Sequence, residues 1–329
     1  MDEEQYHQEG VMEVPVRVIR NDDPEGEVLV AAVAEQGVDN VGNDDSDGEE
    51  EGEEVAEVPL ADLILDPLDP RRMQLTNEER QWALNIKQAI TASPEINDMS
   101  DFSYAQLALT DRGDLQAALE RAAHMQAFRE EYKILDSMED GMRSLKTTLQ
   151  VFPAAFLSFS YSNSHGSYCF VYDMAAFDLY KLNKQPGLFQ SGMWGIYYLG
   201  HCMAPDFQSM RRGAIFLVEC QGFDWKRNVD LKTIRTIWVD FLAVYPFQIQ
   251  KMKYFHSGLF INLINSLKKR FLPKHIVDKM EIGCMFERRL SDIYLVPDID
   301  AAAQRLLSAL ECSLNRRYEN ERSFVLSGC

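Results

Sequence analysis

The chain has 329 residues, of which 46% are hydrophobic, so it is long enough for one large domain or two smaller ones with a substantial core. The net charge of −19 is unevenly distributed, because residues 1–60 hold 20 acidic and 2 basic residues whereas residues 61–329 hold 32 acidic and 31 basic ones. Proteins that bind nucleic acid usually have a basic domain, so the nearly neutral main part of the chain excludes nucleic acid as an expected partner.

Residues 1–57 are predicted to be disordered, and we place the acidic disordered tail as a whole at 1–70. The stretch NDDSDGEEEGEE at 43–54 repels itself and has nothing to bury. A solubilising tail is the simplest interpretation. The alternative is a regulatory arm that binds a protein partner or folds back onto a basic surface. Ser46 is a phosphorylation candidate, because the acidic residues that follow it suit an acid-directed kinase.

Residues 71–150 are predicted to form an N-terminal helical module. Thr76 and Glu79 form a capping-box pattern at the start of a helix that extends to about residue 90. Ser103 is a second candidate helix start. Asp114 opens a third helix, DLQAALERAAHMQAFREEY, in which apolar residues recur with the helical period.

The hydrophobic period changes in residues 151–296, where short β-branched and aromatic runs alternate with helical patterns. Turn residues at 163–166 predict a hairpin between the first two strands, and the apolar run between Gly213 and Gly222 predicts a buried strand. This order predicts an α/β domain with a mainly parallel sheet. The predicted strands lie at 155–163, 167–174, 213–222 and 250–256, and the predicted helices at 189–203, 230–246, 259–271 and 273–281.

The C-terminal segment, 297–329, is predicted to contain a helix over 300–318. An apolar stripe on this helix is expected to pack on the domain, and a dimer interface is the alternative. Arg316 and Arg317 suit the negative end of the helix dipole. We expect a monomer. The stripe consists of Ile299, Ala303, Leu306, Leu310 and Leu314.

Three segments, taken in order, resemble the CRAL-TRIO lipid-binding family, which includes carriers of phosphatidylinositol, tocopherol and retinaldehyde. They are GAIFLVECQGF from residue 213, FLAVYPFQIQKMKYFH from residue 241 and LKKRFLPKHIVDKMEIG from residue 267. With the helical module, the resemblance spans residues 100–290. It implies a CRAL-TRIO-like fold, in which a mixed, mainly parallel sheet and its helices enclose an apolar pocket behind a small helical module.

The resemblance also implies a movable gate helix at residues 259–271, LFINLINSLKKRF. Its apolar stripe would line the pocket when closed and contact the bilayer when open, and its basic end would attract anionic headgroups. An ordinary amphipathic helix that packs on a sheet is the alternative. The implied lipid-pocket residues are Phe216, Val218, Trp238, Phe241, Met252, Tyr254, Leu259, Phe260, Leu263, Ile264 and Phe271. The implied headgroup or membrane residues are Lys253, Lys268, Lys269, Arg270 and Lys279.

No catalytic motif stands out. The sequence has no G-x-S-x-G, no H-E-x-x-H and no glycine-rich phosphate loop, and its six histidines are dispersed. Glu219, where the family usually has Asp, is expected to bond the backbone of the next loop. His256, where the family has Asn, is expected to make a structural hydrogen bond.

Six cysteines, at residues 169, 202, 220, 284, 312 and 329, show neither a CxxC pair nor a metal-ligand spacing. We therefore expect free thiols in a reducing compartment and no metal site. No apolar run is long enough to span a bilayer, and the start of the chain lacks the pattern of a secretory signal. A cytoplasmic protein that associates transiently with membrane surfaces is expected.

The expected function is to bind a hydrophobic lipid (a phospholipid, phosphoinositide or isoprenoid) and to exchange it with membranes, without catalysis and with no cofactor besides the bound lipid. The alternative is a regulatory module that senses a lipid without transferring it and acts through its acidic tail. A hydrolase built on the same sheet is a third hypothesis, for which the sequence offers no recognisable nucleophile.

Overall fold

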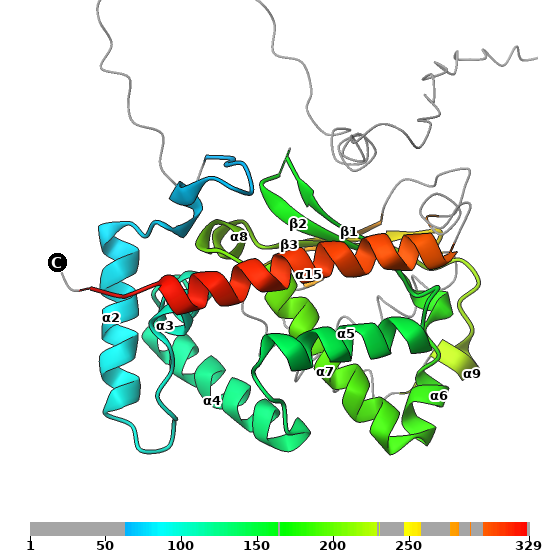
Figure 1. Ribbon diagram of the computed structural model, residues 1–329, viewed down its shortest axis with the longest axis horizontal. Coiled ribbons are helices and arrows are strands. Elements are labelled where there is room, and N and C mark those ends of the chain that lie inside the picture. Colours follow the sequence, from blue (N-terminus) through cyan, green and yellow to red (C-terminus); the bar gives the residue numbers. More distant parts are fainter. Residues whose placement is uncertain are drawn as a thin grey trace, which may run out of the picture.

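The computed structural model describes residues 63–163, 165–228, 230, 247–257, 277–282, 290 and 299–327. In this part of the chain, α-helices pack against a five-stranded mixed sheet (Figure 1), which confirms the predicted α/β class. None of the described helices has the length and apolar character needed to cross a membrane.

Helices precede the sheet, as the sequence predicts for residues 71–150. A short 3-10 helix lies ahead of four α-helices, and Figure 1 shows α2, α3 and α4 grouped at one end of the molecule. The elements are η1 (Pro70–Met73), α2 (Asn77–Thr91), α3 (Asp101–Thr110), α4 (Leu115–Tyr132) and α5 (Met138–Val151).

Side-chain caps explain where these helices begin. α2 starts with the predicted capping box, in which Thr76 and Glu79 each accept the other's backbone N–H. α4 starts after Asp114, also as predicted. The start predicted for α3 is wrong, because the hydroxyl of Ser100 accepts the backbone N–H of Ser103 and so places the first turn three residues earlier.

The sheet has the order β1-β2-β3-β4-β5. β1 and β2 form the predicted antiparallel hairpin, and the remaining neighbours are parallel. One prediction fails, because part of the expected helix at 273–281 belongs to β5, which pairs with β4. Three residues are too few to show a period of two in the sequence. The strands are β1 (Phe156–Ser162), β2 (Ser167–Asp173), β3 (Ala214–Glu219), β4 (Ile249–Phe255) and β5 (Met280–Ile282).

Helices connect the parallel strands where the chain is described. The connection from β2 to β3 contains η2 (Met174–Ala176), α6 (Leu179–Lys184), α7 (Pro186–Met203) and α8 (Phe207–Arg212), and α9 (Trp225–Asn228) follows β3. α7 confirms the helix predicted at 189–203. The helix predicted at 230–246, except residue 230, and the gate helix predicted at 259–271 lie outside the described residues.

Gly213 lies immediately before β3, in a conformation that favours glycine. Its φ is +75°, and a Cβ added there would lie 2.4 Å from the carbonyl oxygen of Gln248. The close approach lets that oxygen accept the N–H of Ala214 at 2.9 Å. The glycine therefore sets the pairing between the start of β3 and the chain that enters β4.

Alternate strand residues face two different cores. One face, which includes Phe170, Phe216 and Met252, belongs to the large cluster that also contains buried residues of α7 and α15. We call it the α7 face. The opposite face forms a smaller cluster made of Leu157, Cys169, Val171, Ile215, Leu217, Phe255 and Leu290.

The long C-terminal helix α15 (Ile299–Ser323) lies across β1 and packs on α5 and α7 (Figure 1). Leu306, Leu310 and Leu314 of the predicted stripe are buried, so the stripe faces the chain's own core, as predicted. The helix continues beyond residue 318. Arg316 and Arg317 consequently lie inside the helix, and their predicted position at its C-terminal end is wrong.

Candidate functional site

Four of the predicted lipid-pocket residues lie together on the α7 face of the sheet. The parallel register places Phe216 beside Met252, and Val218 beside Tyr254. All four side chains are buried, none with more than 5% of its surface exposed. The two strands therefore present one continuous apolar surface at the centre of the sheet.

The described lysines of the predicted membrane surface lie on β4 and beside β5. Lys253 is half-buried and alternates with Met252 and Tyr254 along β4, and Lys279 is exposed. The carbonyl oxygen of Lys279 accepts the N–H of Met252 at 2.9 Å, which ties the start of β5 to β4. The other predicted residues lie outside the described part of the chain: Trp238, Phe241, Leu259, Phe260, Leu263, Ile264, Phe271, Lys268, Lys269, Arg270 and Ser46.

A small apolar cavity lies between the sheet and the helices that cover its α7 face. Its volume is about 20 Å³, which is room for about one water molecule and not for a lipid chain. None of the four predicted residues above lines it. The lining residues are Leu145, Thr148, Leu149, Phe156, Phe170, Gly195, Ile196, Leu199 and Leu310.

Glu219 and His256 meet where β3 and β4 end. The fully buried Glu219 carboxylate accepts the backbone N–H groups of Cys220, Gln221 and Leu290, each at 2.9 Å. His256 Nδ1 donates to the same carboxylate at 2.9 Å. The carboxylate is therefore fully engaged in holding loops, which confirms the structural roles predicted for both residues.

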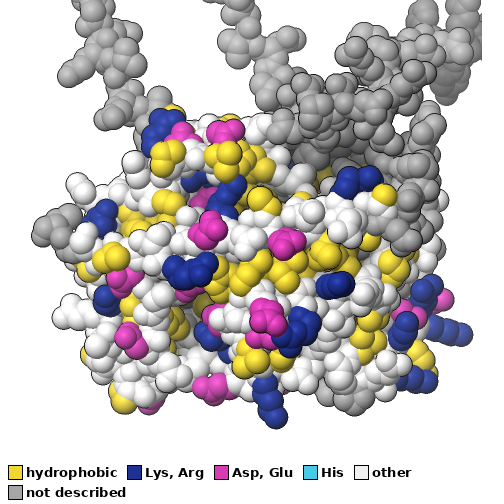
Figure 2. All heavy atoms as spheres, viewed as in Figure 1, with side chains coloured by type: hydrophobic (Ala, Val, Ile, Leu, Met, Phe, Trp, Pro, Cys, Tyr) yellow, Lys and Arg dark blue, Asp and Glu magenta, His cyan; other side chains and the backbone are white. Residues whose placement is uncertain are grey.

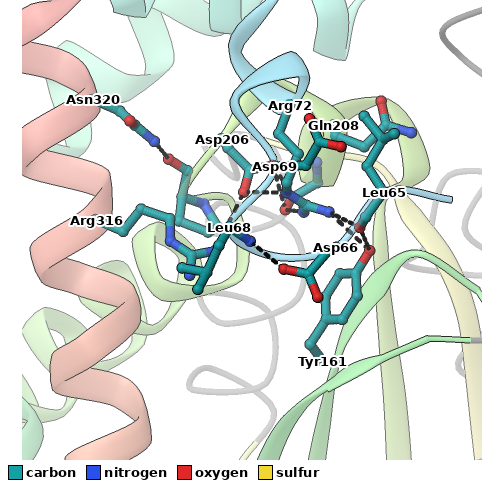
Figure 3. Close-up of polar contacts among 12 residues, drawn as sticks. Leu65, Asp66, Leu68, Asp69, Arg72, Tyr161, Asp206, Gln208, Arg316 and Asn320 are labelled. Carbon is teal, nitrogen blue, oxygen red and sulfur yellow. Dashed lines mark hydrogen bonds and ion pairs between the residues drawn. The ribbon is translucent and has the colours of Figure 1, made fainter. Parts of the chain in front are cut away.

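Arg72 anchors the segment around Leu65, near the end of the tail predicted at 1–70 (Figure 3). The side chain is 1% exposed and forms a bidentate ion pair with Asp206, in which Nε–Oδ2 and Nη2–Oδ1 are both 2.9 Å. Nη1 donates to the carbonyl oxygen of Leu65 and to the hydroxyl of Tyr161, each at 2.8 Å. Figure 3 also shows Arg316 of α15 approaching Asp206, at 3.8 Å. Because the guanidinium donors of Arg72 all have acceptors, we assign this cluster a structural role.

A polar cleft opens where α3, α4, α7 and α15 meet. Its volume is about 410 Å³, within the range of small-molecule sites. Figure 1 shows the C-terminal part of α15 beside α3, and Figure 2 shows acidic and basic side chains intermingled on the face that carries α15. The lining residues are Asn97, Asp98, Met99, Ser100, Ser103, Met125, Gln126, Arg129, Glu130, Ile134, Asp136, Tyr197, His201, Arg317 and Glu321.

His201 forms the inner wall of the cleft as a neutral ring. Its Nδ1 lies 3.1 Å from the carbonyl oxygen of Tyr197, and a carbonyl cannot donate, so Nδ1 carries the proton and Nε2 is an acceptor. Burial, reinforced by the charge of Arg317, lowers the pKa of His201 to about 4. Burial opposes ionisation of nearby Asp136, yet His201 once it is protonated, Arg129 and the Tyr318 hydroxyl hold the pKa of this carboxyl below its usual value.

Arg317 is the least satisfied charged residue described in the cleft. It is 2% exposed, Nη2 donates to Gln106 Oε1 at 2.7 Å, and the guanidinium lies 4.1 Å from the Phe102 ring centroid. Its Nε and Nη1 have no hydrogen-bond partner. The sequence analysis assigned Arg317 to the helix dipole. The sequence does contain a signal for its burial: Arg317 lies three residues after Leu314 and so continues the buried stripe of the helix.

The remaining chemistry in the described residues is modest. No group of three or more His, Cys, Asp or Glu side chains among them is placed to hold a metal ion. Cys169, Cys202 and Cys220 are buried free thiols, as expected, whereas Cys312 is exposed. The cysteines at 284 and 329 lie outside the described residues.

Comparison of the chain with protein-family models gave no match, and comparison with curated proteins gave none. Function is therefore inferred from the residues and their geometry.

Proposed function

We propose that the protein binds a hydrophobic lipid (a phospholipid, phosphoinositide or isoprenoid) on the α7 face of its sheet and exchanges it with membranes. The observation that carries this proposal is the parallel register of β3 and β4, which gives Phe216, Val218, Met252 and Tyr254 one continuous apolar surface. The CRAL-TRIO-like order of the sequence segments around these strands supports it.

The proposed gate belongs to the connection from β4 to β5. The strands β2 to β5 are neighbours in one parallel series. Connections between such neighbours are almost always right-handed, so successive connections along the series fall on one face of the sheet. Since α7, in the connection from β2 to β3, packs on the α7 face, we propose that residues 259–271 act on that face as well.

The energetics permit exchange between a closed and a membrane-bound gate. Removing apolar surface from water contributes about 25 cal/mol per Å² whether the new surroundings are protein or lipid, so the apolar stripe of residues 259–271 exchanges one for the other at small net cost. Lys268, Lys269 and Arg270 add roughly 1 kcal/mol each near an anionic surface. Binding is therefore expected to be stronger on anionic than on neutral vesicles and to weaken with salt.

Native mass spectrometry with lipid analysis of the full chain, expressed in eukaryotic cells, tests the pocket. The expected result is one lipid per chain. Val218→Phe and Leu217→Phe form a matched pair, because the two residues are adjacent, buried and on opposite faces of β3. Only Val218→Phe is expected to lower lipid occupancy. A lipid-free chain that takes up nothing from vesicles contradicts the proposal.

Transfer between vesicles tests the gate separately. Leu263→Glu places a charge on the apolar stripe, whereas Asn265→Glu places the same charge off it. We expect only Leu263→Glu to slow transfer. Equal rates for the two variants would count against a gate at residues 259–271.

A lipid-sensing module without transfer activity is the second candidate. It is favoured by the anchoring of residues 63–72, which fixes the point where the acidic tail joins the body of the protein. Removing residues 1–57 separates the candidates. Transfer that persists or rises supports the carrier, and loss of a bound protein partner in a chain that shows no transfer supports the sensor.

A further inference from the structure

We propose that the cleft between α3, α4, α7 and α15 binds a small zwitterionic molecule, whose oxyanion, a phosphate or carboxylate, bonds Arg317 and whose amine faces Glu130. This site is separate from the sheet face of the proposed lipid function, because its residues come from helices and the loops between them.

The unpaired donors of Arg317 carry the proposal. A buried guanidinium normally has acceptors for its N–H groups, since leaving them unpaired costs free energy. Nε and Nη1 of Arg317 have none, although the residue is 2% exposed and lies in the wall of the cleft. Its closest carboxylate, Glu321, is 3.9 Å away and accepts instead the hydroxyl hydrogen of Ser100 at 2.6 Å. An oxyanion supplies the missing acceptors in the geometry that arginine favours.

The charges that line the cleft favour a ligand that carries a cationic group as well as the oxyanion. Four carboxylates line it, from Asp98, Glu130, Asp136 and Glu321, against the two guanidinium groups of Arg129 and Arg317. A bare dianion would face this excess of negative charge, whereas the amine of a zwitterion offsets part of the negative charge of its oxyanion.

The amine position follows from the partners of the carboxylates. Asp136 pairs with Arg129 at 3.3 Å and accepts the Tyr318 hydroxyl at 2.8 Å. Glu130 accepts only a neutral amide described here, that of Gln126 at 3.0 Å. Glu130 is exposed at the rim of the cleft, so an amine reaches it without being buried.

Thermal unfolding and calorimetric titration of the full chain with phosphoethanolamine test the site, with inorganic phosphate and ethanolamine as anion-only and cation-only probes at equal ionic strength. We expect phosphoethanolamine to raise Tm and to bind more tightly than either probe. Arg317→Met is expected to weaken binding roughly tenfold or more, because a charge-assisted hydrogen bond is lost. Arg322→Met, an exposed change on the same helix, is expected to leave binding unchanged.

Glu130→Gln provides a second variant that leaves the buried residues intact. It is expected to weaken phosphoethanolamine binding without changing inorganic phosphate binding, and Glu131→Gln, its exposed neighbour, to change neither. No Tm rise with phosphoethanolamine, or an equal rise in native protein and Arg317→Met, overturns the site. Equal binding of phosphate and phosphoethanolamine overturns the amine subsite.

Phosphoethanolamine is also the headgroup of a phospholipid, so the source of the ligand needs its own measurement. Flotation with phosphatidylethanolamine vesicles is compared with phosphatidylcholine vesicles. If the protein binds free phosphoethanolamine but does not float with the vesicles, the ligand of the cleft is a soluble molecule. Flotation that is lost in Arg317→Met, with no binding of the free molecule, assigns the oxyanion to a membrane headgroup.

Discussion

Acidification is expected to destabilise the protein through His201. The ring is 3% exposed, and burial together with the charge of Arg317 lowers its pKa from 6.5 to about 4. An unfolded chain restores the ordinary value, so it takes up a proton as the pH falls through 6.5, whereas the folded chain does so only near 4. The stabilising contribution of neutral His201 is therefore complete above pH 6.5, decreases between 6.5 and 4, and loses nothing more below 4.

The size of the effect follows from the shift. One pKa unit corresponds to about 1.4 kcal/mol, so the fall from 6.5 to about 4 predicts a loss of about 3 kcal/mol across the window. His201→Gln removes the titrating ring and retains a donor for the carbonyl oxygen of Tyr197. Urea unfolding at several pH values, for native protein and variant, measures the difference between them.

The difference between native protein and His201→Gln reports the titration of His201 and not that of its charged neighbours. Asp136 and the two α15 residues Arg317 and Glu321 face the ring and remain in both proteins. His124→Gln, an exposed change on α4, is the control and is expected to follow native protein. Equal losses of stability in native protein and His201→Gln between pH 6.5 and 4 would refute the reasoning.

Three further predictions concern stability and reactivity. Arg72→Met removes the bidentate partner of the buried Asp206, leaves Arg316 at 3.8 Å as its cationic neighbour, and is expected to lower the free energy of unfolding by about 3 kcal/mol, whereas the double variant with Asp206→Leu recovers much of the loss, as chemical denaturation can measure. Gly213→Ala is expected to cost about 1–3 kcal/mol because of its positive φ and the nearby carbonyl, while Gly187→Ala, with open space around it, costs little; melting curves of the two separate them. Alkylation followed by peptide mapping is expected to label Cys312 well before the three buried cysteines; simultaneous labelling in native protein contradicts the packing.

Local signals in the sequence predict much of the fold. The capping box of Thr76 and Glu79 locates α2 because the two residues are three apart and the side chain of each accepts the backbone N–H of the other. The parallel arrangement of β2, β3 and β4 is also predictable, because strand and helix patterns alternate along the sequence. β5 is missed because three residues carry no readable period, and α3 is misplaced because two serines three residues apart both match a cap.

The candidate sites are less accessible to sequence reasoning, because they depend on partners distant in the chain. No feature of the sequence near Arg72 indicates that its ion-pair partner is Asp206, which lies 134 residues away. The sequence suggests that Arg317 interacts with the helix dipole at the C-terminal end, and only the structure shows that α15 extends past this residue. Strand alternation places Phe216, Val218, Met252 and Tyr254 on one side of the sheet, and their role in a lipid pocket stays a prediction.

The position of α15 has a consequence for how the chain folds during synthesis. α15 covers β1 and α5, and its hydrogen bonds to Gln106 of α3 and to Ser100, the N-cap of α3, join residues 211 and 221 positions apart. Such contacts form only after the ribosome has released α15, so the apolar surface of the earlier helices stays uncovered until then. A product truncated before residue 299 would keep that surface exposed and become a substrate for chaperones and proteases.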